Sequence, residues 1–255
     1  MSTLIKLAGV KKVFGSGAGA VHAFGPVDMQ IMEGEFISLL GPSGCGKSTL
    51  MLMIAGLLDI TEGEITLAGR GVNGPQTDIG IMFQDNTLVP WRTVRGNIDL
   101  QLEMRGNDPA AHAAEVEELL HSVHLEDFQT RFPHELSGGM QQRAAFCQAM
   151  VHKPKTMLLD EPLGKLDAMT RESIRKDLQS LWMQKRPTVV FVTHSIEEAI
   201  QLSSRVAIIT PRPGKIERII DIDLPYPRDF EVKSSSKFTG YVRETQEIFR
   251  NYGVI

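Results

Sequence analysis

The stretch GPSGCGKS at residues 41–48 has the residue types and spacing of a phosphate-binding loop. Gly41, Gly44 and Gly46 would let the backbone turn its N–H groups toward one point, and a following helix would add the positive end of its dipole. Lys47 would bring a positive charge to the terminal phosphates of a nucleotide, and the Ser48 hydroxyl would be a ligand for Mg²⁺. The spacing therefore predicts a nucleotide-phosphate site.

Two adjacent carboxylates follow an apolar run in TMLLDE, residues 156–161. Asp160 would end a strand at the sheet edge where ligands bind in open α/β sheets, and it could hold Mg²⁺ through water molecules. Glu161 would be placed to polarise an attacking water. The alternative is a buried strand that ends in an acidic turn, but the phosphate loop elsewhere in the chain favours the site.

A second anion site is predicted at LSGGMQQR, residues 136–143. Ser137 followed by Gly138 and Gly139 would begin a helix, so a hydroxyl, free backbone N–H groups and a helix dipole would point at one spot. Taken alone the segment would indicate an ordinary helix cap. A phosphate loop alone, in turn, is typical of kinases, GTPases and many ATPases.

The rest of the chain has the alternation of short apolar runs and longer helical patterns that an α/β domain requires. Five runs predict strands of a sheet covered on both faces: 35–41, 78–84, 156–161, 188–195 and 205–210. Residues 4–14 and 63–69 predict strands of a smaller antiparallel sheet. Residues 97–154 hold no strong strand candidate and predict an inserted helical subdomain, with helices at 97–106, 111–125 and 138–153.

Composition limits the other possibilities. The 255 residues are 42% hydrophobic and 23% charged with a net charge of -4, so no global basic field indicates nucleic acid or anionic lipid as the main partner. The apolar run at 50–58 is too short to span a bilayer, and the N-terminus indicates a strand rather than a signal peptide. Cys45 and Cys147 are expected to be reduced thiols, and His121 and His124 a solvated pair rather than a metal site.

The phosphate loop, LSGGMQQR and LLDEP stand in one characteristic order, and with them the sequence resembles the nucleotide-binding subunit of an ATP-binding cassette (ABC) transporter over nearly its full length. The resemblance implies an α/β fold with a P-loop NTPase core of the RecA-like type and a mostly parallel sheet. It also implies a small antiparallel β subdomain and an inserted helical signature subdomain at about 86–154. The ATPase domain would cover 1–230 and a C-terminal helical extension 231–255.

The resemblance further implies a head-to-tail dimer that holds ATP and Mg²⁺ between two copies of the chain. Ser137 and Gly139 of one copy would cap the γ-phosphate held by Lys47 of the other. The resemblance implies four catalytic residues: Glu161, His194, Gln84 and Lys47. Phe14 would stack on adenine, and the other nucleotide-binding residues would be Gly41, Pro42, Ser43, Gly44, Cys45, Gly46, Lys47, Ser48, Thr49, Ser137, Gly138, Gly139 and Gln141. The metal-binding residues would be Ser48, Gln84 and Asp160.

Two segments depart from the pattern of the family. EPLGKLDAMTR has Lys165 where a small residue is common, in the loop that would carry Asp167 across the dimer interface. Lys165 would either alter communication between the two sites or point to solvent. The signature helix, RAAFCQAMVHKP, holds fewer alanines and arginines than the usual version, so its packing is expected to differ.

Three segments narrow the resemblance to the ATPases of nitrate, sulfonate and taurine importers: 88–98, 210–229 and 238–251. This implies separate membrane permease subunits, an external or periplasmic solute-binding protein, a peripheral location at the cytoplasmic face of the inner membrane, and no nucleic acid partner. Segment 86–94 would form the groove for a helix of the permease, with Leu88 and Trp91 exposed and Trp91 and Arg92 as transmission residues. Trp91 packed into the helical core is the alternative.

Two other classes of function compete with transport. A non-transport ABC ATPase that acts on nucleic acid would usually carry two cassettes or a long coiled-coil insertion, and neither is present in the sequence. A P-loop kinase would leave LSGGMQQR without a role.

Overall fold

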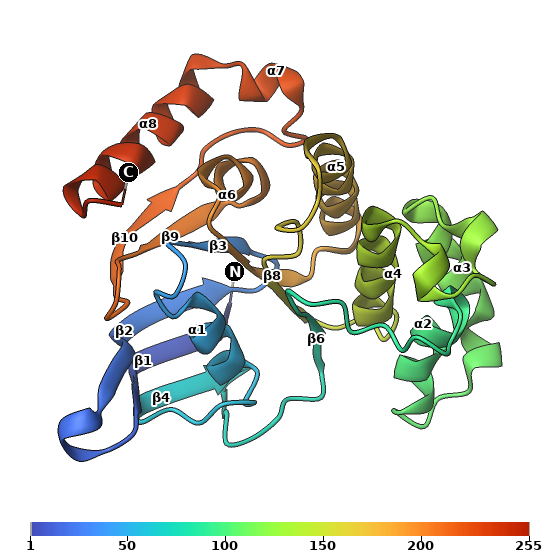
Figure 1. The fold of residues 1–255 in the computed structure, drawn as a ribbon, viewed down its shortest axis with the longest axis horizontal. Coiled ribbons are helices and arrows are strands. Elements are labelled where there is room, and N and C mark those ends of the chain that lie inside the picture. Colours follow the sequence, from blue (N-terminus) through green and yellow to red (C-terminus); the bar gives the residue numbers. More distant parts are fainter. Residues whose placement is uncertain (1, 255) are drawn as a thin grey trace. The chain divides into compact units, whose positions relative to one another are not determined.

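The computed structural model describes residues 2–254, and these divide into two compact units. Unit 1 is formed by the residues up to Thr77 and those from Pro187 onward, and unit 2 runs from Asp78 to Arg186. Figure 1 labels the helices and strands of both units. Each unit is described separately below.

Unit 1 contains an antiparallel sheet with the order β2-β1-β4-β5. The strands are β1 (Thr3–Phe14), β2 (Val21–Met32), β4 (Glu62–Leu67) and β5 (Arg70–Gly71), and a 3₁₀ turn, η1 (Gly17–Gly19), connects the first two. Strands β1 and β4 confirm the antiparallel sheet predicted for residues 4–14 and 63–69. Strands β2 and β5 were not predicted.

The second sheet of unit 1 is built around β3 (Phe36–Leu40), which pairs in parallel with β8 (Thr188–Thr193) and β9 (Arg205–Ile209). β10 (Ile216–Asp221), which was not predicted, pairs antiparallel with β9. Every residue of β3 and β8 is buried, as expected for a parallel sheet covered on both faces. The sheet therefore gives a rigid base for the segments that follow these strands.

The helices of unit 1 are α1 (Lys47–Ile54), α6 (Ile196–Leu202), α7 (Phe230–Lys233) and α8 (Ser236–Asn251). The last helix of the chain, α8, is drawn in red in Figure 1 and contacts α6. Its apolar face, including Phe238 and Phe249, packs into a cluster with Ala199 and Ile200 of α6. The predicted C-terminal helix therefore covers one side of α6.

Unit 2 contains β6 (Ile79–Met82) and β7 (Thr156–Asp160), which pair in parallel. Its helices are α2 (Val94–Glu103), α3 (Ala113–Ser122), α4 (Gly138–Met150) and α5 (Ala168–Lys185), with 3₁₀ turns η2 (Pro109–His112), η3 (Glu126–Phe128) and η4 (Pro133–Glu135). Within the described part of the chain, residues 97–154 contain no strand, which agrees with the predicted helical insertion. Helix α5 was not predicted.

Between residues 2 and 254, no helix has both the length and the apolar character needed to cross a membrane.

Candidate active site

The predicted phosphate loop of unit 1 lies between β3 and α1, as the sequence indicated. Gly44 and Gly46 have positive φ values of 76 and 101, in the region that glycine adopts without strain. Gly41 is required for a different reason, because a Cβ atom there would lie 2.7 Å from the carbonyl oxygen of Ile209. The three glycines thus give the loop its path.

Lys47 is the first residue of α1, and its side chain is only 4% exposed. The Nζ ammonium donates hydrogen bonds to the carbonyl oxygens of Gly41 at 2.8 Å and Pro42 at 2.9 Å. The lysine therefore closes the loop on itself and holds a positive charge within it. A buried cation at a helix N-terminus is an arrangement that attracts a phosphate.

Cys45 within the loop and Arg212 outside it make further contacts with the loop. Cys45 is buried, and its sulfur lies 2.9 Å from the position of a Cβ at Gly41, so the thiol packs against the loop and only its backbone could reach a ligand. Arg212, which the sequence analysis did not single out, donates to the Gly44 carbonyl at 3.1 Å through Nη2. The sequence indicated Arg212 only through its position in segment 210–229, which resembles the ATPases of nitrate, sulfonate and taurine importers.

Four residues around the lysine keep partial access to solvent. Pro42, Ser48 and Thr49 are half-buried, and Ser43 is exposed. Ser48, the predicted Mg²⁺ ligand, directly follows Lys47 in the first turn of α1.

His194 directly follows β8 and is exposed. Its neighbours in the chain are fixed: the Thr193 hydroxyl donates to Glu198 Oε2 at 2.6 Å and accepts from the Ser195 N–H at 3.0 Å. Ser195 is the N-cap of α6. The histidine side chain thus extends from a well-ordered corner between a strand and a short helix.

Phe14 ends β1 and is 43% exposed. The ammonium of Lys12 lies 5.1 Å from the centre of its ring. The ring is thus partly exposed to solvent and partly covered by Lys12.

In unit 2, the structure brings two of the predicted catalytic residues together. Asp160 is the last residue of β7 and is 7% exposed, and Glu161 follows with a φ of 42, a strained value for a residue with a side chain. Gln84, after β6, donates from Nε2 to Glu161 Oε2 at 3.4 Å. The carboxylate of Glu161 is therefore oriented by an amide from the neighbouring strand.

The two residues after Gln84 contact two other predicted segments. Asp85 forms an ion pair with Lys165, and the lysine lowers the pKa of the Asp85 carboxyl. Lys165 therefore contacts an exposed aspartate instead of only pointing to solvent. Asn86 donates to Gln141 Oε1 at 2.7 Å, and the Gln141 amide in turn donates to the Pro133 carbonyl oxygen at 2.7 Å. In this structure the Gln141 side chain thus contacts its own unit.

Ser137 is exposed and is the N-cap of α4, where its side chain accepts from the Met140 N–H at 3.3 Å. Gly138 is exposed. A Cβ atom at this position would contact only the Leu166 side chain, at 3.9 Å. Gly139 is buried, and a Cβ there would lie 2.3 Å from the Thr170 side chain of α5. The second glycine is therefore required for helix packing, and the first leaves the helix end open to a ligand.

The segment at 86–94 differs from expectation at one residue. Trp91 is 77% exposed as predicted, but Leu88 is only 7% exposed, so its predicted exposure was wrong. The cause is Asn97, a fully buried residue that the sequence analysis did not single out. Its Oδ1 accepts from the Val89 N–H at 2.6 Å and its Nδ2 donates to the Arg92 carbonyl at 3.0 Å, which folds the segment back at Leu88 and leaves Trp91 outside.

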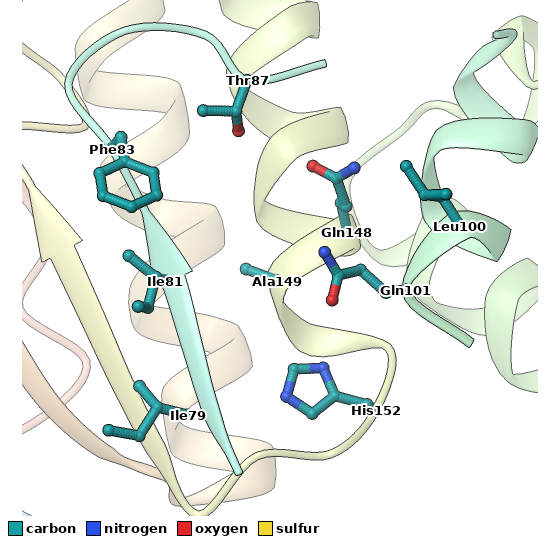
Figure 2. Close-up of a pocket in the computed structure, with 9 residues that line it drawn as sticks. All are labelled: Ile79, Ile81, Phe83, Thr87, Leu100, Gln101, Gln148, Ala149 and His152. Carbon is teal, nitrogen blue, oxygen red and sulfur yellow. The ribbon is translucent and has the colours of Figure 1, made fainter. Parts of the chain in front are cut away.

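A pocket of about 300 Å³ lies beside this segment in unit 2 (Figure 2). Its walls come from β6 and the segment after it, from α2, and from the end of α4: Ile79, Ile81, Phe83, Thr87, Leu100, Gln101, Gln148, Ala149 and His152. Burial, followed by the charge of Arg105, lowers the pKa of His152 to about 4. The imidazole is therefore neutral at pH 7, and the pocket presents mostly apolar and uncharged groups.

The candidate ligands for Mg²⁺ are the Ser48 hydroxyl, the Asp160 carboxylate and the Gln84 amide. Ser48 belongs to unit 1 and the other two to unit 2, and each offers an oxygen atom of the kind that Mg²⁺ prefers. Among residues 2–254 no group of three or more His, Cys, Asp and Glu side chains could hold a metal ion. His121 is 80% exposed and pairs with Glu126.

Comparisons with known proteins agree on one family. A family profile described as "ABC transporter" matches residues 24–164. An uncharacterized ABC transporter ATP-binding protein of Methanocaldococcus jannaschii is 40% identical over 98% of this chain and 93% of its own length. The aliphatic sulfonates import ATP-binding protein SsuB of Bacillus licheniformis is 42% identical over 86% of this chain and 84% of its own length.

A solved structure extends the similarity to the fold. It is a dimeric ATP-binding cassette in a post-hydrolysis state with ADP and Pi, with a TM-score of 0.74 and 34% identity over 86% of this chain and 99% of that one. The α/β fold predicted from the sequence is therefore confirmed.

The loop geometry predicts that Gly46→Ala impairs nucleotide binding. A Cβ at this position would lie 2.9 Å from Phe24 and 3.0 Å from the Ala23 carbonyl, on a backbone with φ of 101. We expect the affinity for ATP to fall by about 10-fold or more, because strain of roughly 1–3 kcal/mol would be relieved only by moving the loop. Calorimetric titration with ATP measures this affinity.

Gly240→Ala in α8 is the matched control, since a Cβ there meets open space. It should bind ATP normally and gain about 0.5–1 kcal/mol in free energy of unfolding. Unchanged ATP affinity in Gly46→Ala would contradict the assigned role of the loop.

Proposed function

Because the chain belongs to the ABC transporter family, whose ATP-binding subunits are ATPases, we propose that two copies of it hydrolyse ATP to power an importer of a small anion or a sulfonate-type solute. The observation that carries the proposal is the phosphate loop, with its positive-φ glycines and its buried Lys47 at the start of α1. The contact between Gln84 and Glu161 supports the hydrolytic part.

The chemistry rests on groups with separate roles. Lys47 and the loop N–H groups bind the β- and γ-phosphates of ATP. Mg²⁺, held by Ser48, Asp160 and Gln84, would neutralise charge on the phosphates. Glu161 accepts the proton of the attacking water, and Gln84 orients its carboxylate from 3.4 Å.

Two further residues would complete the site. His194 holds the γ-phosphate and the water, and it suits this role because it is exposed at an ordered corner after β8. Phe14 would stack on adenine through the exposed part of its ring.

The second copy of the chain would complete each site. The N-terminus of α4, with the exposed Ser137 and Gly138, is suited to cap the γ-phosphate bound by the other copy. The dimeric cassette found in the structural comparison supports this arrangement. In the proposed arrangement the packing of Gly139 against α5 keeps the helix end in place.

The proposed partner outside the dimer is a pair of integral membrane permease subunits, with a periplasmic or surface solute-binding protein acting through them. The chain would then work at the cytoplasmic face of the cell membrane as a peripheral subunit. Relatives named for aliphatic sulfonate import support the solute class. The exposed Trp91 and the adjacent Arg92, which forms an ion pair with Glu103, would contact a cytoplasmic helix of the permease.

Glu161→Gln tests the hydrolytic step. The variant should bind ATP but hydrolyse it about 10²- to 10⁴-fold more slowly, equivalent to roughly 3 to 5 kcal/mol of barrier, because the amide cannot accept the proton. Phosphate release by the purified chain measures the rate. Glu118→Gln, which removes only an exposed ion pair with Lys185, is the control and should hydrolyse normally. Near-normal turnover by Glu161→Gln would remove Glu161 from the role.

Sharing of the site between two copies is tested by mixing variants. A Ser137→Arg chain and a Lys47→Ala chain should each be nearly inactive alone, because each damages both sites of its own dimer. In the mixture, heterodimers would have one site damaged twice and one intact. ATPase activity should therefore recover in part and depend on total protein concentration. Strictly additive loss would favour a site within one chain.

Trp91→Ala tests coupling to the membrane subunits. The isolated subunit should keep its fold and basal ATPase rate, because an exposed ring contributes little to the stability of its own chain. Solute uptake by the reconstituted transporter should collapse, because the ring would be a central contact to the permease. Phe230→Ala is matched, because Phe230 is also 77% exposed but lies on α7, and it should transport normally. Normal uptake with Trp91→Ala would show that this segment is not the coupling surface.

A further inference from the structure

Helix α6 connects His194 with the C-terminal extension. It has only seven residues, Ile196–Leu202, and a helix of this length is unstable in isolation because few hydrogen bonds repay its nucleation. Its position must therefore be fixed by contacts at its ends and along its side. At the N-terminal end, Ser195 and the Thr193–Glu198 hydrogen bond fix the residues next to His194.

The C-terminal end of α6 is capped by side chains from the segment between β10 and α7. Carbonyl groups in the last turn of a helix have no partner within the helix. Here Arg228 Nη1 donates to the Ile200 oxygen at 2.6 Å and to the Ser203 oxygen at 2.7 Å. The Tyr226 hydroxyl donates to the Leu202 oxygen at 2.9 Å. A cation also complements the negative end of the helix dipole.

The same guanidinium ties this helix end to the segment that follows β10. Arg228 Nη2 donates to the Ile222 oxygen at 3.0 Å and to the Leu224 oxygen at 3.2 Å. The side chain is 1% exposed, and the Tyr226 ring lies 4.1 Å from its guanidinium carbon. Burial lowers the pKa of Arg228 from its ordinary value of 12.5, yet the group stays a cation at pH 7.

The side of α6 is covered as well. Phe238 and Phe249 of α8 pack with Ala199 and Ile200, so the C-terminal extension contacts α6 along its face, and the segment before it contacts the helix end. A displacement of this short helix would be carried directly to His194, because only Ser195 lies between the two.

We propose that Arg228 is a positioning residue for His194, which it holds in place by fixing the C-terminal end of α6. The inference rests on the proposed function, in which His194 contacts the γ-phosphate and the water. The segment between β10 and α7 thereby supports hydrolysis through α6.

A double-mutant cycle tests the proposal. Arg228→Gln should lower kcat for ATP by about 10-fold while KM changes by less than about twofold, because misplacing a catalytic group costs rate more than binding. In a His194→Ala background the same substitution should cost less than about twofold in kcat, since the group it positions is gone. Hydrogen exchange of the α6 amides should accelerate in Arg228→Gln.

Two further variants keep the test decisive. Tyr226→Phe removes one hydrogen bond to α6 and keeps the ring, so it should lower kcat by about 2- to 5-fold and be silent in the His194→Ala background. It replaces Arg228→Gln in the cycle if the latter does not fold. Lys237→Gln breaks the exposed ion pair between α8 and Asp223 of the segment after β10, and it should leave kcat unchanged.

The outcomes distinguish the positioning role from the proposed function. Equal fold-losses of kcat for Arg228→Gln with and without His194, or a normal kcat in a folded Arg228→Gln or Tyr226→Phe variant, would overturn the positioning role and leave the proposed function intact. A normal kcat for His194→Ala would overturn the role of His194 itself, and with it this inference.

Discussion

The closure of the phosphate loop by its own lysine is the interaction on which the proposed function depends. The Lys47 ammonium is bound by the carbonyls of Gly41 and Pro42, at the start of a helix and at the end of a fully buried parallel strand. Gly44 and Gly46 hold the backbone in conformations that other residues adopt only with strain. A preformed positive site of this kind needs little rearrangement to bind phosphate. The conformation of the loop therefore contributes more to phosphate binding than contacts specific to one nucleotide.

The other predicted groups are held in a comparable way by contacts within their own unit. In unit 2 the consecutive residues Gln84, Asp85 and Asn86 contact Glu161, Lys165 and Gln141 respectively. A displacement of the segment after β6 would therefore shift the Glu161 carboxylate, the loop of Lys165 and helix α4 together. The ion pair between Asp85 and Lys165 is exposed, so its stabilisation is small, and its effect is on the position of the loops rather than on the fold.

The sequence predicted features whose chemistry is local. The loop at 41–48, Asp160 at the end of β7 and Ser137 as a helix N-cap were all found because spacing along the chain determines them. Features that depend on a specific side-chain contact were missed. Leu88 is buried because Asn97 folds its segment back, and the position of Arg228 under α6 requires a contact between residues that are far apart in the chain. No periodicity in the sequence signals either one.

The most direct test of the central claim is calorimetric titration of the purified chain with ATP, ADP and adenosine under identical conditions. If Lys47 and the loop backbone form a phosphate site, the affinity should depend on the phosphates, with ATP and ADP binding measurably and adenosine at least about 10-fold more weakly, since charge-assisted hydrogen bonds to phosphate would supply most of the binding energy. Adenosine that bound as tightly as ATP would contradict the claim, because the base and sugar alone would then explain recognition.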